Sequence, residues 1–173
     1  SNGRKPSWVY LSEEEFKTLA NHANSDYRAL AWLMYDSVMR VTEAYSIKVC
    51  DFNKNFTQLT IRDEYAKTFG RVIHLKLCSD LIRDYVKYHG LKPTDYIYMK
   101  KPSSFNKYLR RLAEKTFGKG QTLARESYDK MTLYDIRHNA SCYWLKRYSR
   151  NSGLMYRMGW SEEKEVRYYS EFL

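Results

Sequence analysis

The sequence is poor in the residue types that build disulfide scaffolds, metal centres and membrane spans. Only three cysteines and four histidines occur in 173 residues, and no two cysteines form a Cys-x-x-Cys pair. This argues against a zinc cluster or a disulfide framework and predicts a reducing compartment, the cytoplasm of a host cell. No apolar run approaches the length of a membrane span, and no secretory segment opens the chain. We therefore expect neither a bound metal nor a membrane.

Positive charge, by contrast, is in excess. Thirty lysines and arginines stand against twenty aspartates and glutamates, which gives a formal net charge of +10 at pH 7. An excess of this size predicts a polyanionic partner. Nucleic acid is the partner that we expect, and an acidic membrane surface is the alternative that the charge alone leaves open.

The length and the apolar content are those of one globular domain. Apolar residues make up 43% of the chain, and no internal repeat, glycine-rich phosphate loop or low-complexity segment is present. Ser1-Asn2-Gly3 resembles a cloning scar. We therefore treat residues 1–7 as scar and lead-in, and we expect residues 8–173 to form a single domain.

Most of the chain has the apolar spacing of helices. Ser12 with Glu15 three residues later is a capping box at a helix start. Residues 56–62 and 70–75 instead alternate as strands do, which predicts an antiparallel hairpin with a long loop between them. Further helices are expected after a cap at 25–26, over 78–88 and 103–117, from 132, over 154–158 after a break at 151–153, and after a cap at Ser161. The pattern predicts a mainly helical α+β fold with a small antiparallel sheet.

The residues that indicate chemistry lie near the end of the chain. Tyr134 and Arg137 are three apart, so they share one face of a helix. A Gly-Trp turn follows at Trp160, and Tyr169 comes nine positions after that tryptophan. A late tyrosine supplies a phenol that could attack a phosphodiester. The arginine and the ring N–H donor are the groups that such an attack requires beside it.

At these positions the sequence resembles the catalytic domain of the tyrosine recombinases, or integrases. The second signature of that family reads His-x-x-Arg-His, then Leu-Gly-His, then the nucleophilic tyrosine. Tyr134-Asp135-Ile136-Arg137-His138 and Met158-Gly159-Trp160 match it, with Tyr169 at the nucleophile. Trp160 is a known variant, whereas Tyr134 departs from the usual histidine. A tyrosine there resembles integrases of archaeal viruses and plasmids, which suggests that origin and a hyperthermophilic host.

The first signature of the family falls on Arg40, Glu43, Ile47 and Asp51. Without the resemblance, Arg40 could equally be a cation favoured by the dipole at a helix C-terminus. In the family this arginine binds the scissile phosphate, and the glutamate is its buried partner. The resemblance therefore assigns Arg40 to the site and Glu43 to its support.

The family also carries a mobile catalytic lysine on a β-hairpin. Lys67 is the lysine of the expected hairpin loop, and Lys76 is its nearest competitor. A lysine on a surface loop is otherwise simply solvated. We expect Lys67 to be the catalytic one.

A second group of basic residues surrounds the helix expected over 103–117. Lys100 and Lys101 lead into the helix, and the other four fall largely on the side opposite its apolar residues, a pattern that is either a solvated face or a surface for the DNA backbone. With the net charge of the chain, we expect DNA binding here. The residues are Lys100, Lys101, Lys107, Arg110, Arg111 and Lys115.

The resemblance implies a reaction that needs no metal and no other cofactor. Tyr169 would attack the phosphate to give a 3′-phosphotyrosine and a free 5′-hydroxyl, with Arg40 and Arg137 stabilising the charge and Lys67 protonating the leaving oxygen. Tyr134 and Trp160 would donate hydrogen bonds to the phosphate. His138 could replace the missing imidazole base, although a helix histidine more often packs or caps. Tyr168 competes with Tyr169, and the nine-residue offset selects Tyr169.

The function that follows is site-specific recombination of double-stranded DNA at an attachment site, which integrates or excises viral or plasmid DNA. The family implies assembly on DNA as a tetrameric synapse, and commonly an additional N-terminal DNA-binding domain, which this sequence does not include. Alternatives are a type IB topoisomerase, a telomere resolvase, and an inactive basic DNA-binding module that Tyr134 would favour.

Overall fold

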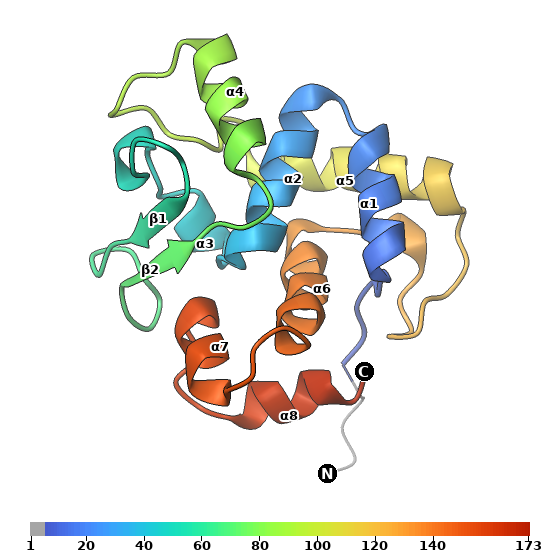
Figure 1. Cartoon of the computed structure of the whole chain (residues 1–173). Helices are drawn as coiled ribbons and strands as arrows, with labels where there is room; N and C mark the ends of the chain where they lie inside the picture. Colours follow the sequence, from blue (N-terminus) through green and yellow to red (C-terminus); the bar gives the residue numbers. More distant parts are fainter. Residues whose placement is uncertain (1–5) are drawn as a thin grey trace.

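The computed structural model describes residues 6–173, so the expected cloning scar lies outside the described residues. Helices surround a central helix, α6, and a pair of strands lies at one side (Figure 1). The mainly helical fold with a small antiparallel sheet is confirmed. The elements in order are α1 (Glu13–His22), α2 (Ser25–Ser37), α3 (Val41–Ala44), η1 (Val49–Asp51), β1 (Gln58–Ile61), β2 (Arg71–His74), α4 (Ser79–His89), α5 (Pro102–Phe117), η2 (Tyr128–Lys130), α6 (Leu133–Leu145), α7 (Asn151–Met158) and α8 (Lys164–Ser170).

α6 is central because apolar residues occur on most of its circumference. Leu133, Ile136, Ala140 and Trp144 are buried, and the helix packs against α2, α5, α7 and α8. α2 is almost as apolar and forms the other half of this core. The indole N–H of Trp144 donates to the carbonyl of Tyr35 on α2 at 3.0 Å. A helix buried on so many sides holds its side chains in fixed positions, which is what a reactive site requires.

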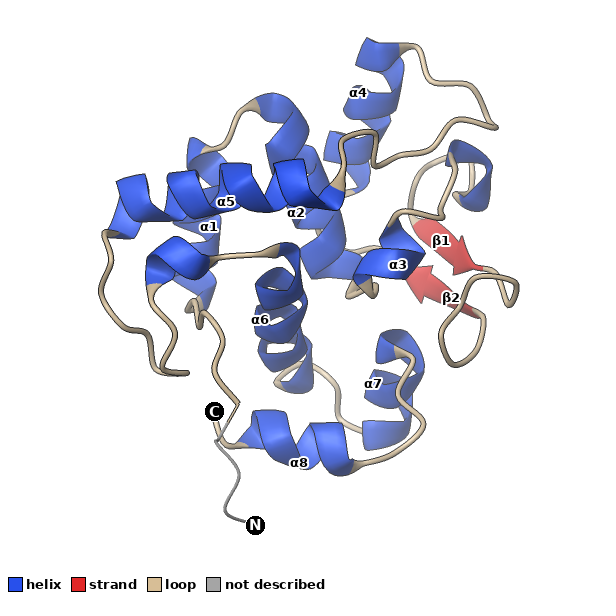
Figure 2. Cartoon of the chain, turned by 180° about the vertical axis from the view of Figure 1, so that it is seen from behind, coloured by secondary structure: helices blue, strands red, loops and turns tan. Residues whose placement is uncertain are grey.

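The sheet has two antiparallel strands and lies beside α3 when the molecule is seen from behind (Figure 2). Its register pairs Gln58 with His74 and Ile61 with Arg71. Alternation buries Leu59, Ile61 and Ile73 on one face, as expected for a half-buried sheet. Arg71 occupies an inward position on that same face.

A buried ion pair between Asp36 and Arg157 connects α2, α7 and the segment that runs from β2 to α4. The Asp36 carboxylate, at the end of α2, accepts hydrogen bonds from the backbone N–H groups that lead into α4. Arg157 on α7 donates to the same carboxylate at 2.7 Å and to the carbonyl of His74 at 2.8 Å. These bonds position the end of α7, and therefore the Met158-Gly159-Trp160 turn.

Several helix boundaries differ from the sequence-based expectation. The cap of α2 is Asn24, whose side chain accepts from the Tyr27 N–H, and not the expected pair at 25–26. Residues 151–153 do not break the chain but form the first turn of α7. α8 begins at Lys164, three residues after the expected cap Ser161. In each case a neighbouring polar residue or a tertiary contact has more influence on the helix boundary than the capping or breaking residue that the sequence suggested. The capping box of Ser12 with Glu15 is confirmed.

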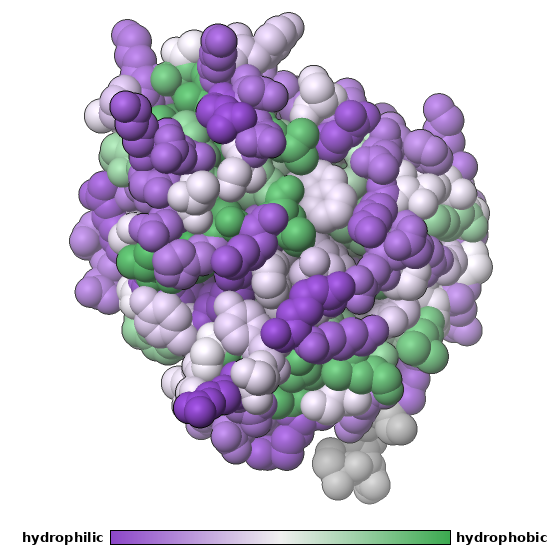
Figure 3. Space-filling view, viewed as in Figure 1, coloured by the Kyte–Doolittle hydropathy of each residue, from purple (hydrophilic) through white to green (hydrophobic). Residues whose placement is uncertain are grey.

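Hydrophilic side chains cover most of the face seen in Figure 3, with smaller apolar patches between them. In the part of the chain that the structure describes, no helix combines the length and the apolar character that a membrane crossing requires.

Candidate active site

Arg40 lies in the turn between α2 and α3. α2 ends where Val38 adopts a left-handed conformation, with φ of 54°, and Arg40 is the N-cap of α3. Its guanidinium Nη2 donates to the carbonyl of Gly159 at 2.9 Å. Arg40 therefore lies beyond the last turn of α2, and its side chain binds the end of α7. It is not a cation placed at the C-terminus of α2, which was the alternative interpretation.

Arg137 approaches the same point from α6. Its Nη2 donates to the carbonyl of Met158 at 3.2 Å, and its Nη1 donates to the carbonyl of Val38. Arg40 and Arg137 are 97 positions apart in the sequence. They nevertheless bind neighbouring carbonyls at the end of α7. This brings together the two signatures found in the sequence.

Glu43 and Arg71 complete the group, which we call the arginine cluster (Arg40, Arg71, Arg137 and Glu43). Glu43 is fully buried, and both nitrogens at the fork of Arg71 donate to it, at 3.0 and 2.9 Å. Burial raises the pKa of Glu43, but the hydrogen bonds and the charge of Arg71 more than reverse this, so that its pKa lies below the usual value. Arg40 lies farther from the same carboxylate, with Nη1 at 3.8 Å.

Positive charge exceeds negative charge in this cluster. Burial, followed by the charge of Arg40, lowers the pKa of Arg137 to about 10. Burial is also the main cause that lowers the pKa of Arg40, with Glu43 opposing and Arg71 adding to it. The Arg40 Nη1 is buried and has no hydrogen-bond partner among the described residues. A buried guanidinium nitrogen without a hydrogen bond is costly, and a bound anion would remove that cost.

Gly159 is required by the close approach of these guanidiniums. It ends α7 in the left-handed conformation, with φ of 70°. A Cβ on it would lie 2.8 Å from Arg71 Nη1 and 2.9 Å from Arg40 Nη1. Its carbonyl accepts from Arg40 and also from the hydroxyl of Thr68, at 2.6 Å. A side chain here would therefore both strain the backbone and displace the arginines.

Tyr169 lies next to the cluster, on α8. Its ring stacks on that of Trp160, with centroids 5.7 Å apart and an angle of 6° between the planes. The two side chains are only 6% and 5% exposed. Burial raises the pKa of Tyr169, and the charge of Arg137 opposes this. The hydroxyl of Tyr169 is hydrogen-bonded to Nδ1 of His138.

Tyr168 points elsewhere. Its hydroxyl accepts a hydrogen bond from the indole N–H of Trp8 at 2.8 Å. Adjacent residues on a helix project about 100° apart, so one of the two tyrosines can face the arginines and the other cannot. Tyr169, and not Tyr168, is the one on which the charge of Arg137 acts, and its role as the nucleophile stays a prediction.

Lys67 lies on the loop between β1 and β2, with an exposed side chain. Its backbone N–H is 3.4 Å from Oε2 of Glu43, and the next residue, Thr68, binds Gly159. The loop is thereby attached to the arginine cluster through its backbone while the lysine side chain projects into solvent. Lys76 lies past β2, where its backbone N–H donates to Asp36.

Tyr134, unlike Arg137 on the same helix, has an exposed side chain. It lies in the first turn of α6, and its side chain is 56% exposed. It stands one helical turn before Arg137.

The basic residues around α5 form a separate surface. Phe105 and Leu109 face the core, as predicted, whereas Tyr108 and Leu112 are only half-buried. Lys100 lies over the ring of Tyr27, 5.6 Å from its centroid. We call the remaining set the α5 basic surface; its exposed members are Lys101, Lys107, Arg111 and Lys115, and Arg110 is half-buried.

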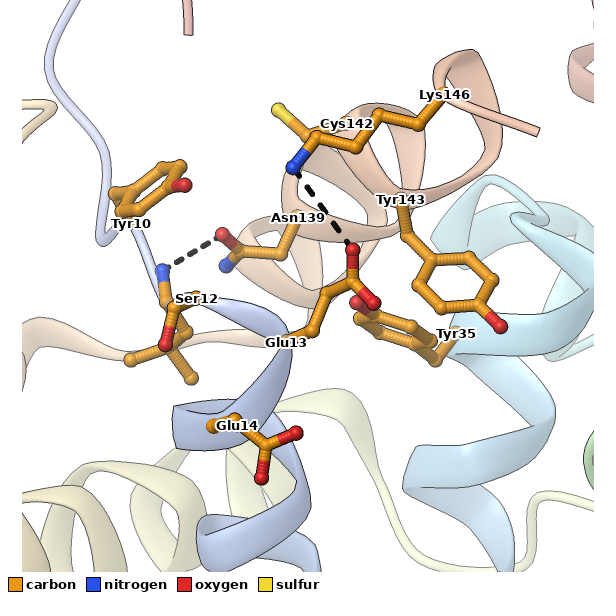
Figure 4. Close-up of a pocket in the computed structure, with 10 residues that line it drawn as sticks. Tyr10, Ser12, Glu13, Glu14, Tyr35, Asn139, Cys142, Tyr143 and Lys146 are labelled. Atoms are coloured by element: carbon orange, nitrogen blue, oxygen red, sulfur yellow. Dashed lines mark hydrogen bonds and ion pairs between the residues drawn. The ribbon is translucent and has the colours of Figure 1, made fainter. Parts of the chain in front are cut away.

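A cavity of about 330 Å³ lies on another side of α6 (Figure 4). There Asn139 accepts the Leu11 N–H at 2.7 Å, and Glu13 faces Lys146 at 3.9 Å. None of the described residues lining it belongs to the predicted site. Within residues 6–173, no group of three His, Cys, Asp or Glu side chains is placed to hold a metal ion.

Sequence reasoning missed Arg71 and Trp8. Arg71 did carry a signal, because a charged residue at an inward position of an alternating strand must have a buried partner. Trp8 packs against His138, with ring centroids 5.1 Å apart, and carried no signal at all. Its contacts join the start of the chain to α6 and α8.

Solved structures with a similar fold include XerA recombinase (18% identity, TM-score 0.74, 98% of this chain and 61% of that chain) and the Tn1549 transposon integrase in complex with circular intermediate DNA (13%, 0.73, 98% and 62%). A lambda integrase dimer bound to a core site is also similar (14%, 0.70, 96% and 49%). The chain thus spans less than two thirds of the length of these proteins. No curated protein matches the sequence.

The model of the phage integrase family matches residues 9–172, nearly the whole chain. The resemblance found in the signature residues is therefore confirmed: the chain belongs to the phage integrase family.

Proposed function

We propose that this chain is the catalytic domain of a site-specific recombinase, which cleaves and rejoins double-stranded DNA through a 3′-phosphotyrosine. One observation carries the proposal. Arg40 presents a buried nitrogen without a hydrogen-bond partner among the described residues, and its charge acts on the neighbouring Arg137, whose own charge acts on Tyr169. A phosphate in that place would satisfy the nitrogen and offset the repulsion between the guanidiniums.

In this proposal the two arginines bind the non-bridging oxygens of the scissile phosphate. Guanidinium forks suit such oxygens geometrically, and their charge stabilises the negative charge that grows during attack. Arg40 and Arg137 already donate to the carbonyls of Gly159 and Met158, so little reorganisation is needed. Trp160 and Tyr134 would each donate one further hydrogen bond to the phosphate.

The Tyr169 oxygen would then attack phosphorus, and the bond to the 5′ oxygen would break. Lys67 is the proposed acid for that leaving oxygen, because the loop that carries it is bound to Glu43 and Gly159. The phosphotyrosine conserves the energy of the broken bond, so a 5′-hydroxyl from another strand can reverse the step. This is the chemistry of strand exchange.

We also propose a partner, an assembly, a location and a source for this domain. The similar Tn1549 integrase is in complex with DNA and the lambda integrase dimer is bound to a core site, which supports DNA as the partner. We propose an attachment site as substrate, a tetrameric synapse, integration or excision of viral or plasmid DNA, and the cytoplasm of a host cell as the location. Tyr134 supports an archaeal virus or plasmid as the source. We keep residues 8–173 as one domain.

The test is the capture of a covalent adduct. A pool of nicked duplexes with randomised sequence is incubated with the protein, and denaturing electrophoresis detects DNA attached to it. The wild type and Tyr168→Phe should both form the adduct, whereas Tyr169→Phe should form none. Sequencing the captured DNA would give the attachment site.

Other outcomes would assign other functions. Binding without an adduct from any variant would contradict the proposal and favour an inactive DNA-binding module, which the exposed position of Tyr134 supports. Relaxation of a supercoiled circle without any preferred sequence would instead indicate a topoisomerase.

A further inference from the structure

The proposed reaction leaves one proton without an acceptor. Tyr169 must lose its hydroxyl proton as it attacks, since a phenol with an ordinary pKa of about 10 is a poor nucleophile. The two positions where the family most often has histidine hold Tyr134 and Trp160. An indole N–H is only a donor, and a neutral phenol is not a base. Another group must take the proton.

His138 is in contact with the atom that must be deprotonated. It follows Arg137 on α6, and its Nδ1 is hydrogen-bonded to the hydroxyl of Tyr169. The imidazole is held in this place by Trp8, whose ring lies 5.1 Å from it and whose N–H is fixed by Tyr168. The contact therefore does not depend on a freely rotating side chain.

The nearby carboxylates are less suited to the task. Glu43 is occupied by both nitrogens of Arg71, and its pKa is lowered. Glu165 lies one turn before Tyr169 on α8 and lines the same pocket of about 380 Å³ as His138. Its Oε2 is buried without a partner among the described residues, and its charge acts on Arg40. Neither carboxylate has a hydrogen bond to the Tyr169 hydroxyl within residues 6–173.

We propose that His138 is the general base of strand cleavage, with its Nδ1 accepting the proton of Tyr169 as that oxygen attacks the phosphate. This inference rests on the proposed function. The O–H electron pair of Tyr169 becomes the new oxygen–phosphorus bond, and the proton passes to Nδ1. The pair of the broken phosphorus–oxygen bond goes to the 5′ oxygen, which takes its proton from Lys67. In rejoining, each proton returns along the same path.

Bound DNA would strengthen this base. Burial, followed by the charge of Arg137, lowers the pKa of His138 to about 4, so the free ring is neutral at pH 7 and its Nδ1 is available as an acceptor. A phosphate bound to Arg137 would offset that charge and raise the pKa of His138. The other titratable groups that line the same pocket as the imidazole are Lys164, Glu165, Tyr168 and Tyr169 on α8, and the charge of Cys142 on α6 acts on Tyr169.

The test compares cleavage rates in single turnover at saturating DNA, with a nicked duplex recovered from the randomised pool. His138→Asn places an amide near the position of Nδ1 and can hydrogen-bond to Tyr169, but it cannot take a proton. We expect cleavage to slow by about 100-fold or more, a range typical of a lost general base. His138→Ala should be slow as well and should be partly restored by added imidazole. His89→Asn, which changes a histidine paired with Asp26 far along the chain, is the matched control and should cleave normally.

A His138→Asn variant that cleaves as fast as the wild type, or faster, would overturn the inference, because the imidazole would then only pack against the nucleophile or restrain it. If no wild-type adduct forms on any DNA, the proposed function itself fails, which is a distinguishable result. A second measurement is independent of variants at this position. The His138 ring is followed by NMR titration in Tyr169→Phe, with and without the duplex. Its pKa should rise on binding, and an unchanged or lowered pKa would contradict the proposal.

Discussion

Two groups of positive charge lie on this molecule, and they differ in how they are held. In the arginine cluster, hydrogen bonds to a buried carboxylate or to carbonyls fix Arg40, Arg71 and Arg137. On the α5 basic surface, Lys107, Arg111 and Lys115 are exposed, and none has an ion pair within residues 6–173. Fixed charges can stabilise a transition state, whereas mobile surface charges mainly attract and position a polyanion. We therefore expect the positive charges behind the net charge of +10 to serve two different purposes.

The largest expected difference between the two groups is in stability. Arg71→Met leaves the Glu43 carboxylate buried without its main partner, which should lower the free energy of unfolding by about 3–5 kcal/mol. Lys115→Met on the α5 basic surface should change it by less than about 0.5 kcal/mol. Urea denaturation measures both. Adding Glu43→Leu to Arg71→Met should recover part of the loss, since the unpaired charge is then removed. Equal small effects at both positions would erase the distinction.

The next effect is on cleavage. Arg137→Lys removes the fork that donates to Val38 and Met158 and that would bind the phosphate. Single-turnover cleavage should fall by about 10²–10³-fold, as when other oxyanion donors are lost. The conservative change Arg111→Lys on the α5 basic surface should leave the rate unaltered. A normal rate in Arg137→Lys would show that a point charge is sufficient and that the fixed geometry is not needed.

His138, the residue after Arg137 on α6, should also make stability depend on pH. The folded pKa of His138, about 4, lies below the ordinary value of 6.5, so the unfolded chain takes up a proton first as the pH falls. The stabilisation is complete above about pH 6.5 and is lost between there and pH 4; from pH 7 to pH 5 the loss is about 2 kcal/mol. His138→Asn should show a smaller change over the same range. Denaturant unfolding at a series of pH values provides the measurement, and parallel curves for the two proteins would rule out this contribution.

The smallest effect on the chemistry is expected from the surface charges. Replacing Lys107, Arg111 and Lys115 by glutamine should weaken DNA binding and reduce the dependence of log affinity on log salt by up to ~0.9 for each phosphate that is no longer neutralised. The cleavage rate at saturating DNA should stay the same. Binding titrations at several salt concentrations, followed by single-turnover cleavage, separate the two quantities. A lower cleavage rate at saturating DNA would show that the α5 basic surface contributes to the cleavage step. The distinction between this surface and the arginine cluster would then not hold.

Local patterns predicted a large part of the fold and of the site. The capping box of Ser12, the hairpin and the helix that carries Arg137 follow from rules of spacing and capping that act within a few residues. Boundaries were less predictable. Ser161 has a capping side chain, yet α8 begins at Lys164, after the turn that brings Trp160 against Tyr169. Tertiary packing fixes that start, and a local signal does not contain it.

The site itself divides in the same way. The types and the spacing of Arg137, Trp160 and Tyr169 identified the family, because these residues lie on successive short elements near the end of the chain. Arg71 was not identified, since its partner Glu43 is 28 positions away and on another element. The half-burial of Tyr108 and Leu112 likewise depends on what covers α5 and not on the periodicity of α5.

By itself, the sequence determined the class of fold, the family and the residues that could perform a phosphodiester reaction. These depend on residue type and on short spacings, which any helix or strand expresses in the same way. Only the tertiary structure decided that Tyr169 meets His138, 31 positions away, and that Trp8 binds Tyr168, 160 positions away. Such contacts arise when separate elements pack around α6, and no local period encodes which side chains then meet.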